Sequence, residues 1–225
     1  MRVLEKLFDV VTPYDCLVCG HEGKLICPWC WPDAFDSVPS RCFICKKASS
    51  DSTSCKNCIT SSVTLEHVWV ATAYTGYSKQ LVKGMKFAQH RQAAHLIAAQ
   101  LHQTLPYLDG DYIVTYVPTA SSRRRERGFD HAKLIAAEFA RVRRLAYAPL
   151  LIRCNQTRQV GHSRSERLAQ VAGAYRPARS RHISKRKILL IDDVITTGAT
   201  IQEASRVLRA AGAKSVDAAI FAQAA

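Results

Sequence analysis

Eight of the nine cysteines stand in four CxxC pairs between residues 16 and 58, and no other feature constrains the folding of a segment of this chain so strongly. The pairs are Cys16 with Cys19, Cys27 with Cys30, Cys42 with Cys45, and Cys55 with Cys58. A CxxC turn directs two thiolates at one centre, and two such turns complete a tetrahedral zinc site. The sequence therefore predicts two zinc ions bound by thiolates, because metal is favoured over disulfides in a cytosolic chain.

The order of the pairs leaves two ways of connecting them. We expect sequential pairing, with Cys16, Cys19, Cys27 and Cys30 around one ion and Cys42, Cys45, Cys55 and Cys58 around the other; a cross-braced arrangement is the alternative. Both arrangements close the metal site with four thiolates, which indicates a structural role. The segment has few large apolar residues, so bound metal has to replace a hydrophobic core. Cys154 stands alone and is expected to be a small buried residue.

A second informative stretch is ILLIDDVITTGAT, residues 188–200. Its apolar run at 188–191 has no polar alternation and fits a strand buried on both faces. A helical pattern follows from Thr200 and stops at Gly212, and residues 215–221 return as an apolar strand. The sequence predicts a βαβ unit whose strand–helix loop lies at the carboxyl edge of a parallel sheet, where ligands bind.

The loop of this unit has the composition of a phosphate site. Its glycine lets the backbone approach a ligand, and its threonine hydroxyls stand beside the first amides of the helix. We expect five residues to bind a monophosphate: Thr196, Thr197, Gly198, Ala199 and Thr200. An ordinary capped helix after a buried strand is the alternative interpretation.

The two carboxylates before this loop predict a different contact. Asp192 and Asp193 would repel a phosphate, so they are expected to accept hydrogen bonds from sugar hydroxyls or to approach Mg²⁺. The stretch as a whole closely resembles the phosphoribosyl pyrophosphate (PRPP) signature of type I phosphoribosyltransferases. That resemblance makes the two aspartates the candidate catalytic residues.

Positive charge is concentrated in one third of the chain. Residues 121–187 hold 18 Lys and Arg against 4 Asp and Glu, a difference of +14, and the rest of the chain has 14 of each. A field of this kind suits polyanions such as nucleic acid or pyrophosphate, with Arg123, Arg124 and Arg125 as the candidate nucleic-acid contacts. A solvated basic face without a ligand is the alternative.

The remaining pattern predicts an α/β domain with a mostly parallel sheet flanked by helices. Strands are expected within 65–74 and 111–118, and helices over 79–105, interrupted near His90, and over 131–145. We expect a zinc-ribbon module at residues 1–62 and a larger domain at 63–225. No apolar stretch reaches membrane-spanning length, and acidic residues interrupt the first apolar run, so a cytoplasmic protein without membrane insertion is the expectation.

The loop Thr119–Asp130 again lies between a strand and a helix. It offers guanidinium groups and a flexible glycine, and Arg127 and Gly128 are the candidate pyrophosphate contacts. The order of features, from the cysteine module through VP…RRRERGFDHAKLIA and TRQVGHSRSERLAQVAGAY to DDVITTGAT, resembles the ComF family of competence-associated proteins over essentially the full chain. Lys86 in KGMKFA is part of the same resemblance.

The resemblance implies a type I phosphoribosyltransferase-like fold and an association with single-stranded DNA in natural transformation or DNA utilisation. It implies that residues 157–167 form a mobile loop over PRPP, with Arg158, Arg164 and Arg167 as counter-charges; an ordinary exposed connection is the alternative. The family usually reads RGFNQ where this chain has RGFDH, so direct ligand contacts from Asp130 and His131 are not carried over. A competence helicase or other DNA-uptake proteins are the implied protein partners.

Three functions are consistent with these features. The first is a PRPP-binding protein of the ComF type that handles single-stranded DNA. The second is an active phosphoribosyltransferase that transfers 5-phosphoribose from PRPP to a nucleobase or related acceptor with Mg²⁺ bound. The third is a non-catalytic zinc-ribbon nucleic-acid adaptor, against which the intact DDVITTGAT argues. Since PRPP binding does not require catalysis, the sequence does not decide whether the protein is an enzyme.

Overall fold

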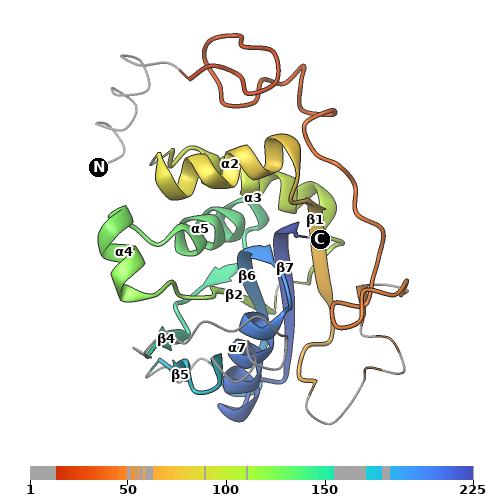
Figure 1. Cartoon of the computed structure of the whole chain (residues 1–225). Coiled ribbons are helices and arrows are strands. Elements are labelled where there is room, and N and C mark those ends of the chain that lie inside the picture. The colour runs from red at the N-terminus through yellow and green to blue at the C-terminus, as the bar shows by residue number, and fades with distance from the viewer. Residues whose placement is uncertain are drawn as a thin grey trace.

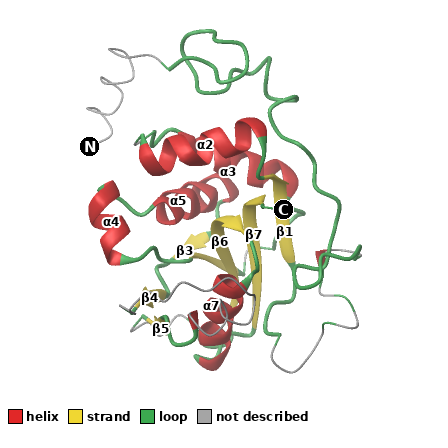
Figure 2. Cartoon of the chain, in the orientation of Figure 1, coloured by secondary structure: helices red, strands yellow, loops and turns green. Residues whose placement is uncertain are grey.

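The computed structural model describes residues 14–49, 52–53, 55, 58, 63–88, 90–109, 111–154, 171–178 and 183–224. The strands are β1 (Val68–Ala73), β2 (Tyr112–Tyr116), β3 (Ala146–Tyr147), β4 (Leu151–Arg153), β5 (Tyr175–Pro177), β6 (Lys187–Ile195) and β7 (Ser215–Gln223). The helices are α2 (Gly76–Phe87), α3 (Ala93–Thr104), α4 (Ser121–Arg127), α5 (His131–Arg143) and α7 (Ala199–Ala210). Figure 2 shows the helices around a central group of strands.

The central sheet has five strands in the order β1-β7-β6-β2-β3. All of its strand pairs are parallel, whereas β4 and β5 form a separate antiparallel pair. Parallel strands buried on both faces read as continuous apolar runs, which is why β6 and β7 lack polar alternation in the sequence. The expected α/β fold with a mostly parallel sheet is confirmed.

Two hydrophobic cores lie on opposite faces of this sheet. One contains buried residues of α2, α3 and α5, such as Met85, Ile97 and Phe139. The other contains buried residues of α7, such as Ala204 and Leu208. Figure 1 shows the same division, with α2, α3 and α5 on one side of the strands and α7 on the other.

The helices follow the sequence pattern with one difference. The expected interruption near His90 is confirmed, because α2 ends at Phe87 and α3 begins at Ala93. The segment expected as a loop at 119–130 instead contains the short helix α4. This helix has no buried residue, so it leaves no apolar periodicity in the sequence from which it could be predicted.

The strand before the aspartates is longer than its apolar run. β6 continues to Ile195 and pairs with β7 through Asp192, Val194 and Ile195. The two aspartates therefore lie inside the last part of a strand and not beyond its end. Adjacent residues of a strand point to opposite faces, so the side chains of Asp192 and Asp193 project to different faces of the sheet.

The cysteine-containing segment crosses from one face of the sheet to the other. Leu25, Ile26 and Ala34 pack in the core of α2, α3 and α5, whereas Phe43 packs in the core of α7. In Figure 1 the segment passes above α2 in red and descends beside β1 in orange. The module thus contacts both layers of the larger domain.

None of the helices in the described part of the chain has the length and apolar character needed to cross a bilayer.

Candidate functional site

The strand order reverses between β2 and β6, and ligands of open α/β sheets bind outside the carboxyl ends of the strands at such a point. From β2 the chain continues outward to β3 at one edge of the sheet. From β6, on the other side of β2, it continues in the opposite direction to β7. At such a switch point the loops after the two strands diverge and leave a crevice between them. Here those loops are 117–130 and 196–198, which overlap the segments 119–130 and 196–200 that the sequence indicated.

The loop after β6 enters α7 through a glycine in a left-handed conformation. Gly198 is the N-cap residue of α7, with φ 78°. The amide of Ala199 donates to the hydroxyl of Thr197 at 3.4 Å. The next amides of α7 have no intrahelical acceptor, so the loop presents backbone donors where the helix dipole is positive. This arrangement suits a phosphate group.

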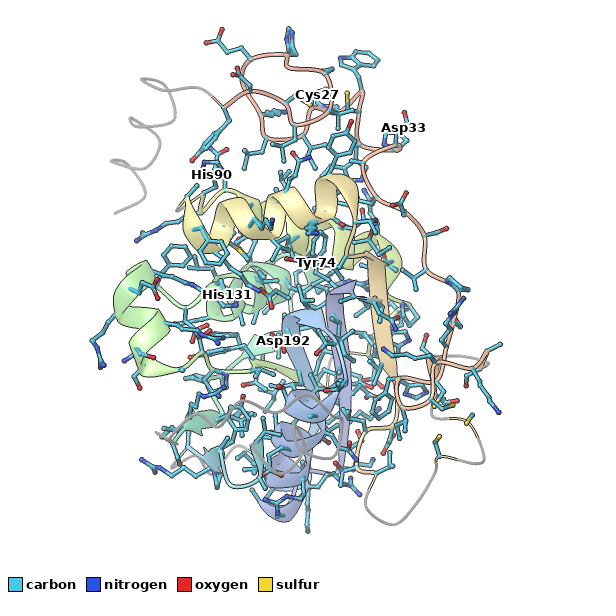
Figure 3. The ribbon with its side chains drawn as sticks, viewed as in Figure 1. Cys27, Asp33, Tyr74, His90, His131 and Asp192 are labelled. Carbon is cyan, nitrogen blue, oxygen red and sulfur yellow. The ribbon has the colours of Figure 1, made fainter. Side chains whose placement is uncertain are left out.

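Asp193 is the centre of a buried group of charged and polar side chains. Its Oδ2 lies 2.5 Å from Nζ of Lys86 and 3.1 Å from Nε2 of His131. Its side chain is only 6% exposed. Three elements, α2, α5 and β6, therefore converge on one carboxylate. Figure 3 labels His131 on α5 and Asp192, the neighbour of Asp193 on β6.

Arg127 contacts the other nitrogen of the His131 ring. Nη1 of Arg127 lies 3.3 Å from Nδ1 of His131. A guanidinium has donors only, so Nδ1 is the acceptor in this contact. His131 therefore lies between Arg127 on one side and Asp193 on the other.

The two adjacent aspartates have pKa values that move in opposite directions. Burial and the neighbouring Asp193 charge raise the pKa of Asp192 well above its usual range. Burial acts in the same direction on Asp193, but the His131 hydrogen bond and the Lys86 charge outweigh it and lower the pKa of Asp193 below its usual range. The pair therefore combines one anionic carboxylate with a neighbour that readily keeps a proton.

Asp130 has a structural role in the neighbouring loop. Its Oδ2 accepts a hydrogen bond from the amide of Thr119 at 2.9 Å, and its Oδ1 accepts from the amide of Lys133 at the start of α5. Asp130 thus closes the loop 119–130 and caps the helix that carries His131. The two residues that depart from the family pattern contact other parts of the protein.

Arg127 has an incompletely satisfied guanidinium. Its Nε is buried and has no hydrogen-bond partner within the described residues. Its Cζ lies 5.2 Å from the centre of the Phe87 ring, which is 70% exposed. A buried guanidinium nitrogen without an acceptor is suited to an anionic ligand such as pyrophosphate. Gly128, which follows it, is exposed and has φ 76°.

The three consecutive arginines lie on the exposed helix α4. Arg123, Arg124 and Arg125 are all exposed. In the basic segment 121–187, the aromatic residues Phe129 and Tyr175 are buried, so they are core residues and are not available for base stacking. The exposed aromatic residue near α4 is Phe87, which lies outside the basic segment and was missed by the sequence reasoning.

The eight paired cysteines form two groups. Cys16, Cys19, Cys27 and Cys30 make the first cysteine cluster, and Cys42, Cys45, Cys55 and Cys58 make the second; within each, the sulfur atoms lie within 4.8 Å of one another. Sequential pairing is therefore confirmed and the cross-braced alternative is wrong. The described cysteines form no disulfide. Sets of four thiolates at this spacing indicate two structural zinc sites.

Backbone hydrogen bonds favour the thiolate form of one cysteine in each cluster, whereas the pKa of Cys30 is raised by neighbouring cysteines and by burial, and the pKa of Cys58 by burial and by neighbouring cysteines. Burial raises the pKa of Cys16, but backbone amides of its own cluster outweigh this effect and lower it to about 6. The same balance lowers the pKa of Cys42 to about 6. Thiolates are the form that binds zinc.

The remaining residues singled out in the sequence are the three arginines of the predicted mobile loop, Cys154 and Lys86. Arg158, Arg164 and Arg167 lie outside the described residues. Cys154 is half-buried, as part of the segment after β4. Lys86 was noted only through the family resemblance, and its contact with Asp193 joins residues that are far apart in the sequence.

Comparisons with known proteins agree with this fold. A family model described as "Phosphoribosyl transferase domain" matches residues 126–225. The chain is 27% identical over 175 residues to "Competence protein ComFC" of Bacillus subtilis (strain 168), covering 74% of this chain and 70% of that protein. It is 28% identical over 214 residues to "Competence protein ComFC" of Streptococcus pneumoniae, covering 92% of this chain and 91% of that protein.

Solved structures are more distant. The "structure of the allosteric regulatory enzyme of purine biosynthesis" matches 58% of this chain with a TM-score of 0.42 and 22% identity, and this match spans 25% of that enzyme. An adenine phosphoribosyltransferase matches 64% of this chain and 75% of its own, with a TM-score of 0.37 and 14% identity.

Proposed function

The chain is a ComF family protein with a phosphoribosyltransferase-type domain, and from this premise we propose that it binds PRPP with Mg²⁺ and handles single-stranded DNA. One observation carries the PRPP assignment. The loop after β6, with its left-handed Gly198 at the start of α7, opens at the same switch point as Arg127, whose Nε is buried without a hydrogen-bond partner among the described residues. The crevice therefore offers donors for a monophosphate and a cation for pyrophosphate.

The residues of the crevice divide the ligand between them. Thr196–Thr200 take the 5-phosphate through amides and hydroxyls, and Arg127 takes the pyrophosphate. Asp192 accepts from a ribose hydroxyl or approaches Mg²⁺, which neutralises part of the pyrophosphate charge when bound. Lys86 and His131 fix the carboxylate of Asp193. The segment 157–167, with Arg158, Arg164 and Arg167, is proposed as the cover of this site.

A thermal-shift measurement tests the PRPP assignment. A ligand that binds only the folded state adds about 2.7 kcal/mol at a hundredfold excess over its dissociation constant. We expect PRPP with Mg²⁺ to raise the melting temperature and Asp193→Ala plus Thr197→Ala to abolish the rise. Thr104→Ala plus Asp109→Ala removes the same groups from exposed positions away from the crevice and should leave the rise unchanged. A normal rise in the crevice variant would show that the assigned loop is wrong.

Single-stranded DNA is proposed to bind along α4. The helix has no buried residue and exposes three consecutive arginines, and Phe87 beside Arg127 offers an exposed ring for base stacking. A contact of this type has little base preference. Competence proteins of DNA uptake are the proposed protein partners, in a cytoplasmic setting.

The salt dependence of binding tests this surface. Each phosphate neutralised on a single strand contributes roughly −0.7 to the slope of log affinity against log salt, so about five contacts give a slope near −3.5. Substituting Arg123, Arg124 and Arg125 by Ala should flatten the slope by about two. As a control, the same substitution of the exposed Arg141, Arg144 and Arg186 should change the slope less. An unchanged slope in the first variant, or no binding at low salt, would remove the DNA assignment.

Phosphoribosyl transfer to a nucleobase is the second candidate function. It is favoured by the opposed pKa shifts of Asp192 and Asp193, because adjacent carboxyl groups of this kind can divide acid and base roles. PRPP consumption across nucleobases, with and without single-stranded DNA, separates catalysis from binding. Consumption that requires an acceptor and is lost in Asp192→Asn supports this candidate.

A further inference from the structure

The second cysteine cluster lies directly against the proposed phosphate loop. Nζ of Lys46 donates to the carbonyl of Thr196 at 3.1 Å. Phe43 is 4% exposed, and its Cδ2 would lie 3.2 Å from a Cβ added to Gly198. One residue of the cluster's turn therefore bonds the loop, and another packs under its glycine.

The lysine bond fixes the orientation of a backbone donor. A trans peptide unit is planar, so its carbonyl and its N–H point in opposite directions. Holding the carbonyl of Thr196 toward Lys46 turns the N–H of Thr197 away from the lysine. A hydrogen bond to the carbonyl also polarises this peptide unit and makes its N–H a stronger donor. Lys46 thus acts on one of the amides assigned to the phosphate.

Lys46 also supplies a charge that the loop does not have. Residues 188–205 contain Asp192, Asp193 and Glu203 but no lysine or arginine. A phosphate in this loop would face carboxylates from its own strand without a nearby cation of the same segment. The ammonium group of Lys46, within hydrogen-bond distance of the loop, offsets part of that repulsion.

The backbone of Lys46 has a left-handed conformation that is unfavourable for a residue with a side chain. The first cluster uses the same turn, in which Gly20 follows Cys19 with φ 73° and donates to the carbonyl of Cys16. In the second cluster Lys46 follows Cys45 with φ 64° and donates to the carbonyl of Cys42. A left-handed residue with a side chain is strained, and such strain persists where the surroundings favour it. Here the side chain reaches the phosphate loop.

We propose that the second cysteine cluster is part of the phosphate site, and that zinc held there positions Lys46 and Phe43 to set the affinity for the phosphate of PRPP. Zinc bound by Cys42 and Cys45 fixes the turn between them and the residue that follows. This inference rests on the proposed binding of PRPP. Lys46 is a positioning residue that acts through the peptide unit of Thr196.

Isothermal titration with PRPP and Mg²⁺, with zinc content measured on the same samples, tests the proposal. Lys46→Gly restores the residue type of the first cluster's turn and removes the bond to Thr196. We expect it to keep both zinc ions and to bind PRPP about tenfold more weakly, the effect of one charged hydrogen bond. Lys47→Gly removes the same charge from the neighbouring exposed residue and should bind PRPP like the wild type.

The outcomes separate this inference from the proposed function. Equal PRPP affinity in Lys46→Gly and the wild type would overturn the role of Lys46 and leave PRPP binding intact. Absence of PRPP binding in the wild type would overturn both. If Lys46→Gly loses zinc, Lys46→Asn replaces it, because asparagine tolerates the left-handed conformation and lacks the charge; wild-type affinity in that variant would also overturn the inference.

Discussion

The two cysteine clusters share a ligand set and a turn but contact opposite faces of the sheet. The first packs on the side of α2 and α3, where Nε1 of Trp31 donates to Oε1 of Gln103 at 2.9 Å. The second packs on the side of α7 and contacts the loop after β6. In Figure 3, Cys27 of the first cluster lies beyond α2, away from His131 and Asp192.

This difference separates a stabilising role from a role in the site. A closed set of four thiolates does the same chemistry in both clusters, because it fixes a turn. What the turn does then depends on the surface against which it lies. On the first side that surface is a helix without a proposed ligand, and on the second side it is the proposed phosphate loop.

Removal of zinc should have the largest effect. A structural zinc site can contribute on the order of 10 kcal/mol of apparent binding free energy, so chelation should unfold the cysteine segment up to about residue 60 and leave the domain with its own apolar strands largely folded. We expect metal analysis to find two zinc ions and no iron. Limited proteolysis, circular dichroism and PRPP titration before and after chelation measure the result.

Two outcomes would contradict this prediction. One zinc ion per chain or an absorbing iron–sulfur chromophore would change the assignment of the clusters. Unchanged PRPP affinity after loss of both ions would show that the second cluster does not act on the proposed phosphate loop, and the two clusters would then have the same role.

Truncation of one aromatic residue beside each cysteine cluster should have an intermediate effect on stability and on PRPP affinity. Phe43→Ala removes a buried ring and should cost about 3–5 kcal/mol in the free energy of unfolding. Trp31→Ala removes a half-buried ring and should cost about 2 kcal/mol. Denaturant unfolding measures both costs. Of the two variants, only Phe43→Ala should lower PRPP affinity, because Phe43 packs under Gly198.

The milder Phe43→Leu is a second variant for the case in which Phe43→Ala does not fold. Weaker PRPP binding by Trp31→Ala, at a temperature where it remains folded, would show that both clusters act on the site and would end the distinction between them.

Exchange of the left-handed residue in the first cluster should have the smallest effect. Gly20 has open space where a Cβ would be added, so Gly20→Lys introduces backbone strain of about 1 kcal/mol without a clash. The melting temperature should fall by about 2–4 °C, with PRPP affinity unchanged. A melting temperature equal to that of the wild type would show that a lysine is tolerated in this turn without strain, and that the backbone of Lys46 carries no information about function.

The sequence by itself determined the features that lie within short stretches. The thiolate pairs, the buried strand of β6, the glycine at the start of α7 and the interruption between α2 and α3 each follow from the chemistry of neighbouring residues. Local spacing also favoured the sequential cysteine clusters that the structure contains. These features are readable because propensity, turn geometry and CxxC spacing act over a few residues.

Tertiary structure decided which of these features meet. Lys86 and His131 come to Asp193 from two helices, and Lys46 contacts Thr196 across a separation of 150 residues. Periodicity indicates which face of an element is buried but not which side chain lies opposite, and an exposed helix such as α4 has no such face to indicate. Lys46 meets the proposed phosphate loop because the cysteine segment crosses the sheet and packs beside α7, and that packing depends on the shape of the whole domain.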